Sequence, residues 1–370
     1  MRQRTSGSWE LRVYAGMDPD THRRRYRTAT VRGNRADAQR TLDELVAAVR
    51  GERSIGSRSP VSELLEAWYA IASTSWAPTT IRQTRSVLDR YLHPHLGHLR
   101  VGDVTPAVID ACYARLRHSG GAQGQPLAAG TLARIHVVLR SALAQAVRWG
   151  WIWDNPAERA HRIVATPAEL QPPSPAELAT LLEELVVDDP RLYVFVLVAA
   201  VTGARRAQLL GLRWRNVDLE RGRVAFCAGW VEGPHGPVLA DTKTKRRHVV
   251  DIDTATTAVL ADYSRGIGGE AVNADRFVFS DDHGITAWKP NRVTKAFGRH
   301  RRAAGLRQFR LHDLRHFMAT EMLSAGIPIA VVARRLDHRR VSTTLDRYAY
   351  AVPGGDATAA TLRSIIDHAH

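Results

Sequence analysis

The last sixty residues carry a set of side chains that fits phosphoryl-transfer chemistry. The segment LHDLRH places His312 and Arg315 on one helical face, and the segment LDHRRVSTTLDRY supplies His338 and Tyr348. A tyrosine hydroxyl is a poor nucleophile at neutral pH, because its ordinary pKa is about 10. Cationic groups around a phosphate stabilise both the phenolate and the transition state. The pattern therefore predicts a tyrosine that attacks a phosphodiester, and Tyr350 is a weaker candidate because a two-residue shift changes the helix face.

Two upstream segments offer further cations. In TGARR, Gly203 fits a helix C-terminus, and Arg205 then starts the next helix, where a guanidinium can bind phosphate bidentately. In DTKTKRR, a predicted hairpin presents Lys243 and Lys245. Only four of the 52 Lys and Arg residues are lysines, so a lysine here indicates a need for an ammonium that can protonate a departing alkoxide. The alternative for Arg205 is a solvated arginine at a helix start, and the alternative for the lysine segment is a solvated charged turn. Lys245 and Arg246 are also candidate DNA-binding residues.

An N-terminal block, residues 1–52, has the pattern of a small mixed module. Residues 8–32 alternate in short runs around an Asp-Pro-Asp turn, which predicts an antiparallel hairpin or three-stranded sheet, and residues 36–49 have helical spacing. A basic run follows the turn. It favours a DNA-reading module, with a solvated basic hairpin as the alternative, and its candidate contacts are Arg23, Arg24, Arg25 and Arg27.

A middle block, residues 60–158, reads as an all-α bundle between two linkers at 51–60 and 158–175. Apolar spacing predicts helices over 61–73, 80–92 and 131–149, and Thr105-Pro106 has the form of a helix cap followed by proline in the first turn. The candidate DNA contacts in this block are Arg82, Arg85 and Arg134.

The final block, residues 174–370, mixes helices and strands. We expect strands at 223–227, 238–241 and 248–252, with a short fourth strand at 277–280. Ser342, Thr343 and Thr344 are predicted to cap the last short helix before the tyrosine. The tail, 356–370, has helical spacing and is hypothesised to pack on a neighbouring protomer or, equally, on its own chain.

Bulk composition limits the class of partner. The chain has 370 residues and a net charge of +15, which favours a polyanion such as nucleic acid, although an Arg-biased composition explains part of the excess. Cys112 and Cys227 match neither a disulfide framework nor a zinc site, so we expect buried thiols in a reducing compartment. The longest apolar stretch is too short for a bilayer and no signal peptide is evident, which predicts an intracellular protein on DNA with no membrane contact.

The five motifs together resemble the tyrosine recombinase family, specifically phage-type integrases. They are TGARR, TKTK, LHDLRH, LDH and TTLDRY, and their order and spacing match over residues 175–350. The resemblance implies a mainly α, multidomain chain: an arm-type DNA-binding sheet and helix at 1–52, a core-binding bundle at 60–158, and an α+β catalytic domain at 174–370. It implies a site-specific recombinase that integrates or excises a phage or mobile element.

The resemblance also implies residue roles and partners. Tyr348 would form a 3′-phosphotyrosine, with Lys243 as general acid, His312 as general base or proton shuttle, and His338 as hydrogen-bond donor to the phosphate. Arg205 and Arg315 would clamp the non-bridging oxygens, so no metal or other cofactor is needed. The implied partners are double-stranded attachment sites, a homotetramer on synapsed DNA and, in addition, a host DNA-bending protein and an excision directionality factor.

Three positions depart from the family pattern, and three alternatives stay open. Gln208 stands where Glu is usual, Asn216 where Asp is usual, and Asp337 where Gly is usual. The carboxylate of Asp337 is expected to raise the pKa of the neighbouring His338. The alternatives are a non-catalytic DNA-binding protein on the same scaffold, a type IB topoisomerase-like nicking-closing enzyme, and a chromosome-dimer-resolving recombinase.

Overall fold

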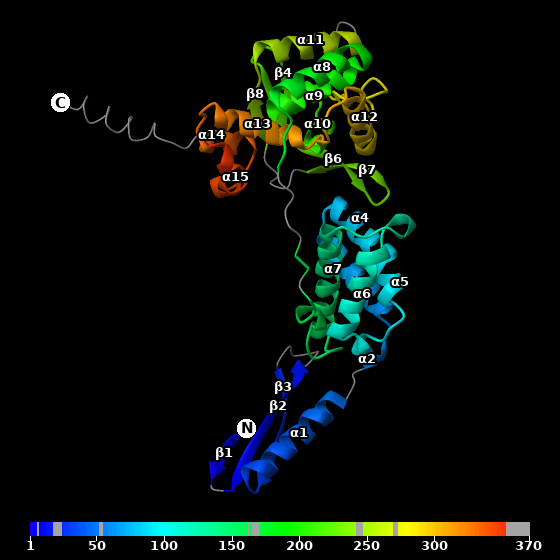
Figure 1. Cartoon of the computed structure of the whole chain (residues 1–370), viewed down its shortest axis with the longest axis vertical. Helices are drawn as coiled ribbons and strands as arrows, with labels where there is room; N and C mark the ends of the chain where they lie inside the picture. Colours follow the sequence, from blue (N-terminus) through cyan, green and yellow to red (C-terminus); the bar gives the residue numbers. More distant parts are fainter. Residues whose placement is uncertain are drawn as a thin grey trace, which may run out of the picture. The chain divides into compact units, whose positions relative to one another are not determined.

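The computed structural model divides into two compact units, Met1–Pro167 and Ala168–His370 (Figure 1). It describes residues 1–5, 7–17, 24–51, 55–161, 163–164, 170–241, 247–268 and 273–352. Within these ranges, no helix is long and apolar enough to cross a membrane. The predicted tail helix at 356–370 lies outside the described residues.

The first unit begins with an antiparallel sheet covered by one helix. The strands β1 (Arg2–Thr5), β2 (Ser8–Met17) and β3 (Arg24–Arg32) lie in the order β1-β2-β3, and α1 (Arg35–Gly51) contacts β2 and β3. Leu11 of β2 and Ala38 of α1 are fully buried. Residues 8–32 therefore form the first of the two predicted forms, an antiparallel hairpin of β2 and β3, and β1, which precedes this range, extends the hairpin to a three-stranded sheet.

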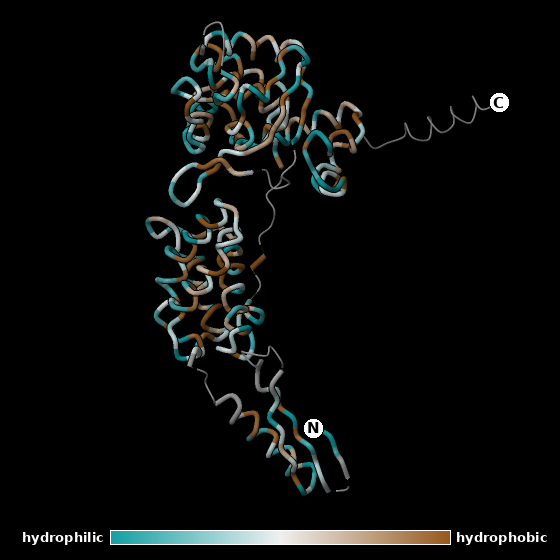
Figure 2. The backbone as a smooth tube through the Cα atoms, turned by 180° about the vertical axis from the view of Figure 1, so that it is seen from behind, coloured by the Kyte–Doolittle hydropathy of each residue, from teal (hydrophilic) through white to brown (hydrophobic). Residues whose placement is uncertain are grey.

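A helical bundle forms the rest of the first unit. Its apolar side chains, including Leu64, Ile109 and Leu139, make one buried cluster, and hydrophobic and hydrophilic stretches alternate along its helices (Figure 2). Thr105 Oγ1 accepts a hydrogen bond from the Val108 N–H, which confirms the predicted cap. The elements are α2 (Ile55–Arg58), α3 (Val61–Ala72), η1 (Ser73–Ser75), α4 (Pro78–Val87), the π-helical turn η2 (Leu88–Leu92), α5 (His93–Leu96), η3 (Val101–Asp103), α6 (Pro106–Ser119), η4 (Ala122–Gly124), α7 (Ala129–Arg148) and η5 (Pro156–Glu158). The predicted linker at 51–60 thus contains a short helix.

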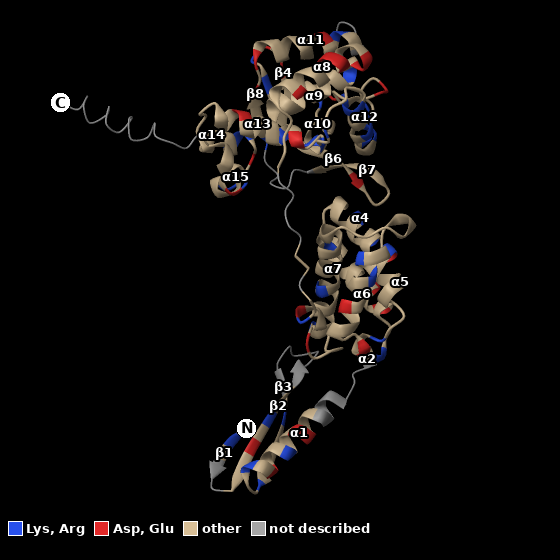
Figure 3. Ribbon diagram, in the orientation of Figure 1, with Lys and Arg blue, Asp and Glu red and all other residues tan. Residues whose placement is uncertain are grey.

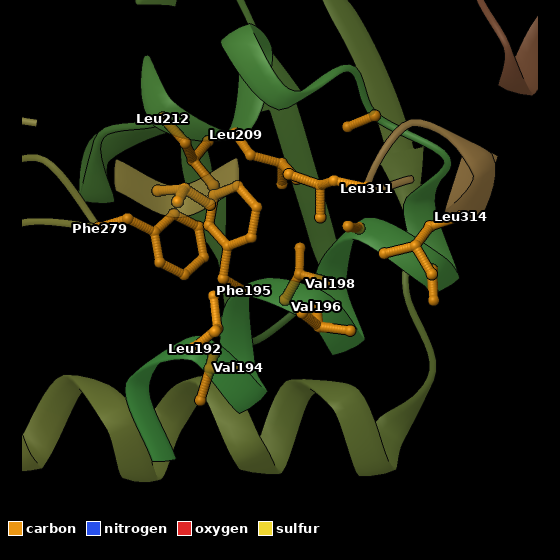
Figure 4. Packing of buried hydrophobic residues seen from close by; sticks show 14 of the residues in the cluster. Leu192, Val194, Phe195, Val196, Val198, Leu209, Leu212, Phe279, Leu311 and Leu314 are labelled. Carbon is orange, nitrogen blue, oxygen red and sulfur yellow. The ribbon is translucent and has the colours of Figure 1, made fainter. Parts of the chain in front are cut away.

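The second unit surrounds an apolar helix, α9 (Pro190–Thr202). Phe195 of α9 meets Phe279 edge to face, with ring centroids 4.8 Å apart, and Leu311 and Leu314 join the same core (Figure 4). The other elements are α8 (Pro175–Asp188), α10 (Arg206–Leu210), η6 (Trp214–Asn216), β4 (Val217–Asp218), β5 (Arg223–Phe226), β6 (Ala228–Gly233), β7 (Gly236–Asp241), β8 (His248–Asp251), α11 (Thr254–Gly268), α12 (Pro290–Ala303), α13 (Asp313–Ser324), α14 (Ile329–Arg335), α15 (Val341–Tyr348) and η7 (Ala349–Ala351).

The strands of the second unit pair differently from the sequence prediction. The described strands form two sheets, β4-β5-β8 and β6-β7, so β7 and β8, which flank the lysine segment, belong to different sheets. The predicted hairpin between them is therefore wrong, and β7 forms a hairpin with β6 instead. The predicted fourth strand at 277–280 is also wrong, because this buried run makes only isolated bridges, from Phe277 to Arg213 and from Ser280 to Ala287.

Candidate active site

The TGARR segment forms a tight turn between α9 and α10. Thr202 is buried, and its Oγ1 accepts the Ala204 N–H at 3.2 Å. Gly203 ends α9 in the left-handed region, with φ +65°, as its sequence position predicts. Arg205 then occupies the N-cap of α10, and its backbone N–H donates to Gln208 Oε1 at 2.9 Å. Gln208 therefore holds the Arg205 backbone by a neutral hydrogen bond.

The HDLR segment enters α13 with its two predicted catalytic side chains in different environments. Asp313 is buried and accepts hydrogen bonds from Arg310, including one from the backbone N–H at 2.7 Å. The buried Leu314 anchors the first turn to the core around α9. Arg315 consequently points inward and is 4% exposed, whereas His312 is exposed.

Two helix ends hold the Arg315 guanidinium. Its Nη1 donates to the Gly203 carbonyl at 2.7 Å, at the end of α9, and its Nη2 donates to the Leu336 carbonyl, at the end of α14. Burial, and next the charge of Arg205, lower the pKa of Arg315 to about 10, so the group stays protonated at neutral pH. A cation held by carbonyls keeps its full charge for a phosphate.

His338 lies beside this arginine in a defined tautomer. Its Nε2 is 3.2 Å from Arg315 Nη2, which can only donate, so Nε2 carries the lone pair. Its Nδ1–H can then donate to Thr344 Oγ1 at 2.8 Å. Burial, and next the charge of Arg315, lower the pKa of His338 to about 4. Asp337 raises the pKa of His338, as expected, but its effect is smaller than that of burial and of the nearby arginines, so the net shift is downward.

The position of Asp337 explains why glycine is usual there. The residue has φ +52°, at the end of α14, where Gly avoids the steric cost of the left-handed region and Asp tolerates it. The helix α15 that follows starts after Arg340, which makes no side-chain cap. The predicted capping by residues 342–344 is therefore wrong, because these residues lie inside the helix.

Tyr348 is buried at the end of α15. Its hydroxyl lies 2.7 Å from His316 Nδ1, and its ring packs with Met318 and Leu336. Burial raises the pKa of Tyr348 to about 12, while the nearby Arg315 lowers it. Tyr350 is 60% exposed, and its hydroxyl lies 3.1 Å from Thr320 Oγ1, so the two tyrosines occupy different environments.

The electrostatics place Arg205 within range of the same cluster. Its positive charge lowers the pKa of Arg315, His312 and His338. The side chain is exposed and, within the described part of the chain, no hydrogen bond or ion pair engages its guanidinium. The structure thus brings together five of the six predicted catalytic residues. The sixth, Lys243, lies outside the described residues, as do Lys245 and Arg246.

The DNA-binding candidates of the first unit divide by environment. Arg82 and Arg134 are exposed and line an open groove of about 700 Å³ beside α4 and α7. Arg85 also borders this groove, but it forms a bidentate pair with Glu66 at 2.8 Å and a further bond to Asp89. Its charge is therefore compensated within the bundle.

The candidates in the N-terminal sheet are less fully defined. Arg27 is exposed on β3, opposite Val13 of β2. Arg24 and Arg25 lie on the same strand with side chains outside the described part, and Arg23 falls outside it altogether.

Two other groups bear on cofactor and thiol chemistry. Glu184, Asp188 and His300 have ligand atoms within 4.8 Å of one another, but they belong to none of the five motifs. His300 Nδ1 lies 3.5 Å from Glu184 Oε1, so the histidine and this carboxylate are neighbours within the cluster. Cys112 is buried as expected, whereas Cys227 is exposed, so the expectation of two buried thiols is wrong.

Comparison with known families agrees with this geometry. Residues 174–353 match the phage integrase family, and residues 61–162 match the phage integrase central domain. The chain belongs to the phage integrase family of tyrosine recombinases. It is therefore a site-specific recombinase, an enzyme that breaks and rejoins DNA strands.

The recombinase has relatives that match most of its length. It is 23% identical over 357 residues to the ICEBs1 integrase of Bacillus subtilis, covering 94% of each chain. It is 26% identical over 356 residues to a putative prophage phiRv2 integrase of Mycobacterium tuberculosis, covering 89% of this chain and 84% of the relative.

Solved structures show the same fold. The Tn1549 transposon integrase, in complex with a circular intermediate DNA, has a TM-score of 0.67 at 16% identity and covers 84% of this chain and 100% of its own. The lambda integrase, as a tetramer bound to a Holliday junction, has a TM-score of 0.61 at 17% identity, with 96% of each chain covered.

Proposed function

We propose that Tyr348 attacks a DNA phosphodiester, forms a 3′-phosphotyrosine and releases a 5′-hydroxyl, so that the recombinase integrates or excises a phage or mobile element. The observation that carries this proposal is the position of Arg315. Its buried guanidinium donates hydrogen bonds to the Gly203 carbonyl of the TGARR turn and to the Leu336 carbonyl of the LDH segment, and its positive charge lowers the pKa of Tyr348. The partner strand's 5′-hydroxyl then attacks the phosphotyrosine, so the energy of the broken bond is conserved.

In this proposal Arg315 and Arg205 bind the non-bridging oxygens of the scissile phosphate. Arg315 has five N–H groups, and the two carbonyl contacts and His338 leave others for an anion. Arg205 offers a second, exposed guanidinium. Both charges stabilise the extra negative charge of the pentavalent transition state.

The three remaining residues would handle protons and orientation. Lys243 is the proposed general acid for the leaving 5′-oxygen, and His312 the base or shuttle. His338, neutral in this structure, would donate to the phosphate once the anion raises its pKa. The set supplies its own cations, which supports a reaction that requires no metal.

A suicide substrate with a nicked core site tests the nucleophile. The wild-type enzyme should trap a covalent protein–DNA adduct, and Tyr348→Phe should bind the DNA without trapping it. Tyr350→Phe is the matched control and should trap normally. An adduct with Tyr348→Phe would refute the assignment and make Tyr350 the candidate.

A sulfur-substituted substrate tests the general acid. Lys243→Ala should cleave an ordinary phosphodiester slowly but recover on a 5′-bridging phosphorothiolate, because a thiol is much more acidic than an alcohol and leaves without a proton. If sulfur gave no recovery, Lys243 would not be the proton donor.

We further propose double-stranded attachment sites as the substrate and a homotetramer as the active assembly. Exchange between two duplexes needs four active sites, and the lambda integrase tetramer on a Holliday junction supports this stoichiometry. The proposed division of labour is arm-site binding by 1–52, core-site binding by 60–158 and catalysis by 174–370. A host DNA-bending protein and a directionality factor are proposed accessories.

Within the core-binding block, Arg82 and Arg134 are the better DNA contacts. Substitution of either by Ala should weaken core-site binding. It should also reduce by about one the number of counterions released on binding, which is measured as the slope of the logarithm of the binding constant against the logarithm of the salt concentration. Arg85→Ala should instead lower the stability of the bundle, because Glu66 and Asp89 lose their partner. Filter binding across a salt series, together with melting curves, separates the two outcomes. A larger binding defect for Arg85→Ala would contradict this division.

The basic helix α12 is a second candidate surface, since Lys and Arg gather along it (Figure 3). Lys295, Arg299 and Arg302 are exposed on this helix, whereas His300 and Arg301 are buried, so the exposed three are its candidate phosphate contacts.

A further inference from the structure

The catalytic helix carries a histidine that the proposed roles leave unused. His316 follows Arg315 directly and lies one helical turn after His312 on α13. It is 3% exposed, and its Nδ1 lies 2.7 Å from the Tyr348 hydroxyl. The two ring centroids are 5.6 Å apart. Among the histidines of the cluster, His316 is therefore the one in direct contact with the proposed nucleophile.

A second contact of the same kind lies one turn further along α13. Thr320, four residues after His316, meets the hydroxyl of Tyr350 at 3.1 Å. One face of α13 thus provides a separate polar partner for each of the two tyrosines. The Tyr348 contact is buried and the Tyr350 contact is exposed, which makes the Thr320 contact a natural control.

We propose that His316 is a positioning residue for the nucleophile: its Nδ1 holds the Tyr348 hydroxyl in one place beside the Arg315 guanidinium. The inference rests on the proposed role of Tyr348. The tyrosine ring is fixed by the apolar cluster around Met318 and Leu336, and the hydrogen bond to His316 fixes the remaining freedom of its hydroxyl. A nucleophile held in a near-attack geometry loses less entropy on reaching the transition state.

The protonation states agree with positioning rather than with proton removal. Burial, and next the charge of His312, lower the pKa of His316 to about 4, so its ring is neutral at physiological pH. Burial raises the pKa of Tyr348 to about 12, so the proton stays on the phenol in this hydrogen bond. The His312 and His316 rings pack edge to face, with centroids 5.1 Å apart, which restrains the His316 imidazole in turn.

The test compares three substitutions in single-turnover cleavage of the nicked core-site substrate, using the full chain. His316→Leu removes the polar contact at similar volume and should slow adduct formation about a hundredfold at saturating DNA. His316→Asn places an amide near the Nδ1 position and, because an amide both donates and accepts, should recover most of that rate. Thr320→Val removes the Tyr350 contact from the same helix face and should cleave like the wild-type enzyme.

Further measurements separate positioning from a merely structural role. Core-site affinity should be unchanged for His316→Leu, and sulfur at the 5′-bridging position should not rescue it, because the defect lies in the nucleophile. If His316→Leu does not fold, His316→Gln serves in its place, since its amide lies too far along the side chain to replace Nδ1. His316→Asn should then cleave faster than His316→Gln.

Each outcome discriminates between the two proposals. The inference would be overturned, with Tyr348 still the nucleophile, if His316→Leu cleaved at the wild-type rate. It would also be overturned if His316→Asn cleaved no faster than His316→Leu, or than His316→Gln where that variant replaces it. An adduct formed by Tyr348→Phe would instead overturn the proposed function itself. The two failures are therefore distinguishable in one set of reactions.

Discussion

Gly203 is the residue at which a single methyl group should disturb both the fold and Arg315, the proposed phosphate-binding arginine. It ends α9 with φ +65°, and its carbonyl accepts a hydrogen bond from Arg315 Nη1 at 2.7 Å. A Cβ at this position would lie 2.1 Å from the Met318 side-chain methyl, Cε. Gly203→Ala must therefore bear both a disfavoured backbone conformation and a steric overlap.

The magnitude follows from these two effects. An L-residue in the left-handed region costs about 1–2 kcal/mol. Overpacking adds about 1 kcal/mol, the low end for a buried site, because the overlapping atom is the end of the flexible Met318 side chain. We therefore expect Gly203→Ala to lower the free energy of unfolding by about 2–3 kcal/mol. Displacement of the Arg315 acceptor by up to about 1 Å should also slow DNA cleavage by as much as a hundredfold.

A matched glycine isolates the backbone effect. Gly326 follows α13 with φ +78°, and a Cβ at this position would have no atom within 4 Å. Gly326→Ala should cost only about 1–2 kcal/mol and leave cleavage unchanged. Met318→Leu, which removes the overlapping methyl, should recover up to about 1 kcal/mol when combined with Gly203→Ala.

Urea denaturation and single-turnover cleavage measure the two consequences separately. If Gly203→Ala were as stable and as active as Gly326→Ala, the packing of Met318 against Gly203 would not be needed to keep the Gly203 carbonyl in its hydrogen bond with Arg315. If stability fell while cleavage did not, the carbonyl contact would be dispensable for catalysis.

Three further predictions concern protons, thiols and a helix end. In the folded protein the pKa values of His316 and His338 are about 4, below the ordinary 6.5, so the unfolded chain binds more protons than the folded chain between these two pH values. The free energy of unfolding should therefore fall as the pH drops from about 6.5 to about 4, and His316 contributes at most about 3 kcal/mol of this loss. The midpoints of urea denaturation across this pH range check the direction. Cys227 should react rapidly with a thiol reagent, whereas Cys112, buried and with a pKa raised to about 11, should react only after unfolding. Ser174→Ala should cost about 1 kcal/mol, measured by urea denaturation, because it removes the capping box of α8.

Local signals in the sequence predicted most of the helices and the placement of the motifs upon them. Gly203 at the end of α9 and Thr105 before α6 are signals of this kind, since a helix end depends on neighbouring residues. The strand pairing was not predictable in the same way. A strand's partner is chosen by tertiary contacts, and β6, with glycines at 229 and 233, has a weak strand pattern of its own.

The contacts within the site could be predicted only in part. Helical spacing placed His312 and Arg315 on one face, but it could not show that His316, and not His312, would contact the tyrosine. That choice depends on how α14 and α15 pack against α13, through side chains such as Leu336 that lie far from the motif in sequence. The sequence also could not show that Arg85, a basic residue in a basic bundle, is held by two carboxylates.

The two left-handed residues of the site have a common cause in the needs of Arg315. Gly203 follows the last turn of α9 and Asp337 follows α14, and each reversal turns a helix-terminal carbonyl, that of Gly203 or Leu336, toward the guanidinium. Helix C-termini carry partial negative charge, so they stabilise the buried cation without cancelling it as a carboxylate partner would. The charge of Arg205 nearby still lowers the pKa of Arg315, which means that the two guanidinium groups repel each other before DNA binds. In the proposed mechanism a DNA phosphate would offset that repulsion. The positive charge that the two helix ends leave uncancelled would then attract the phosphate to the site.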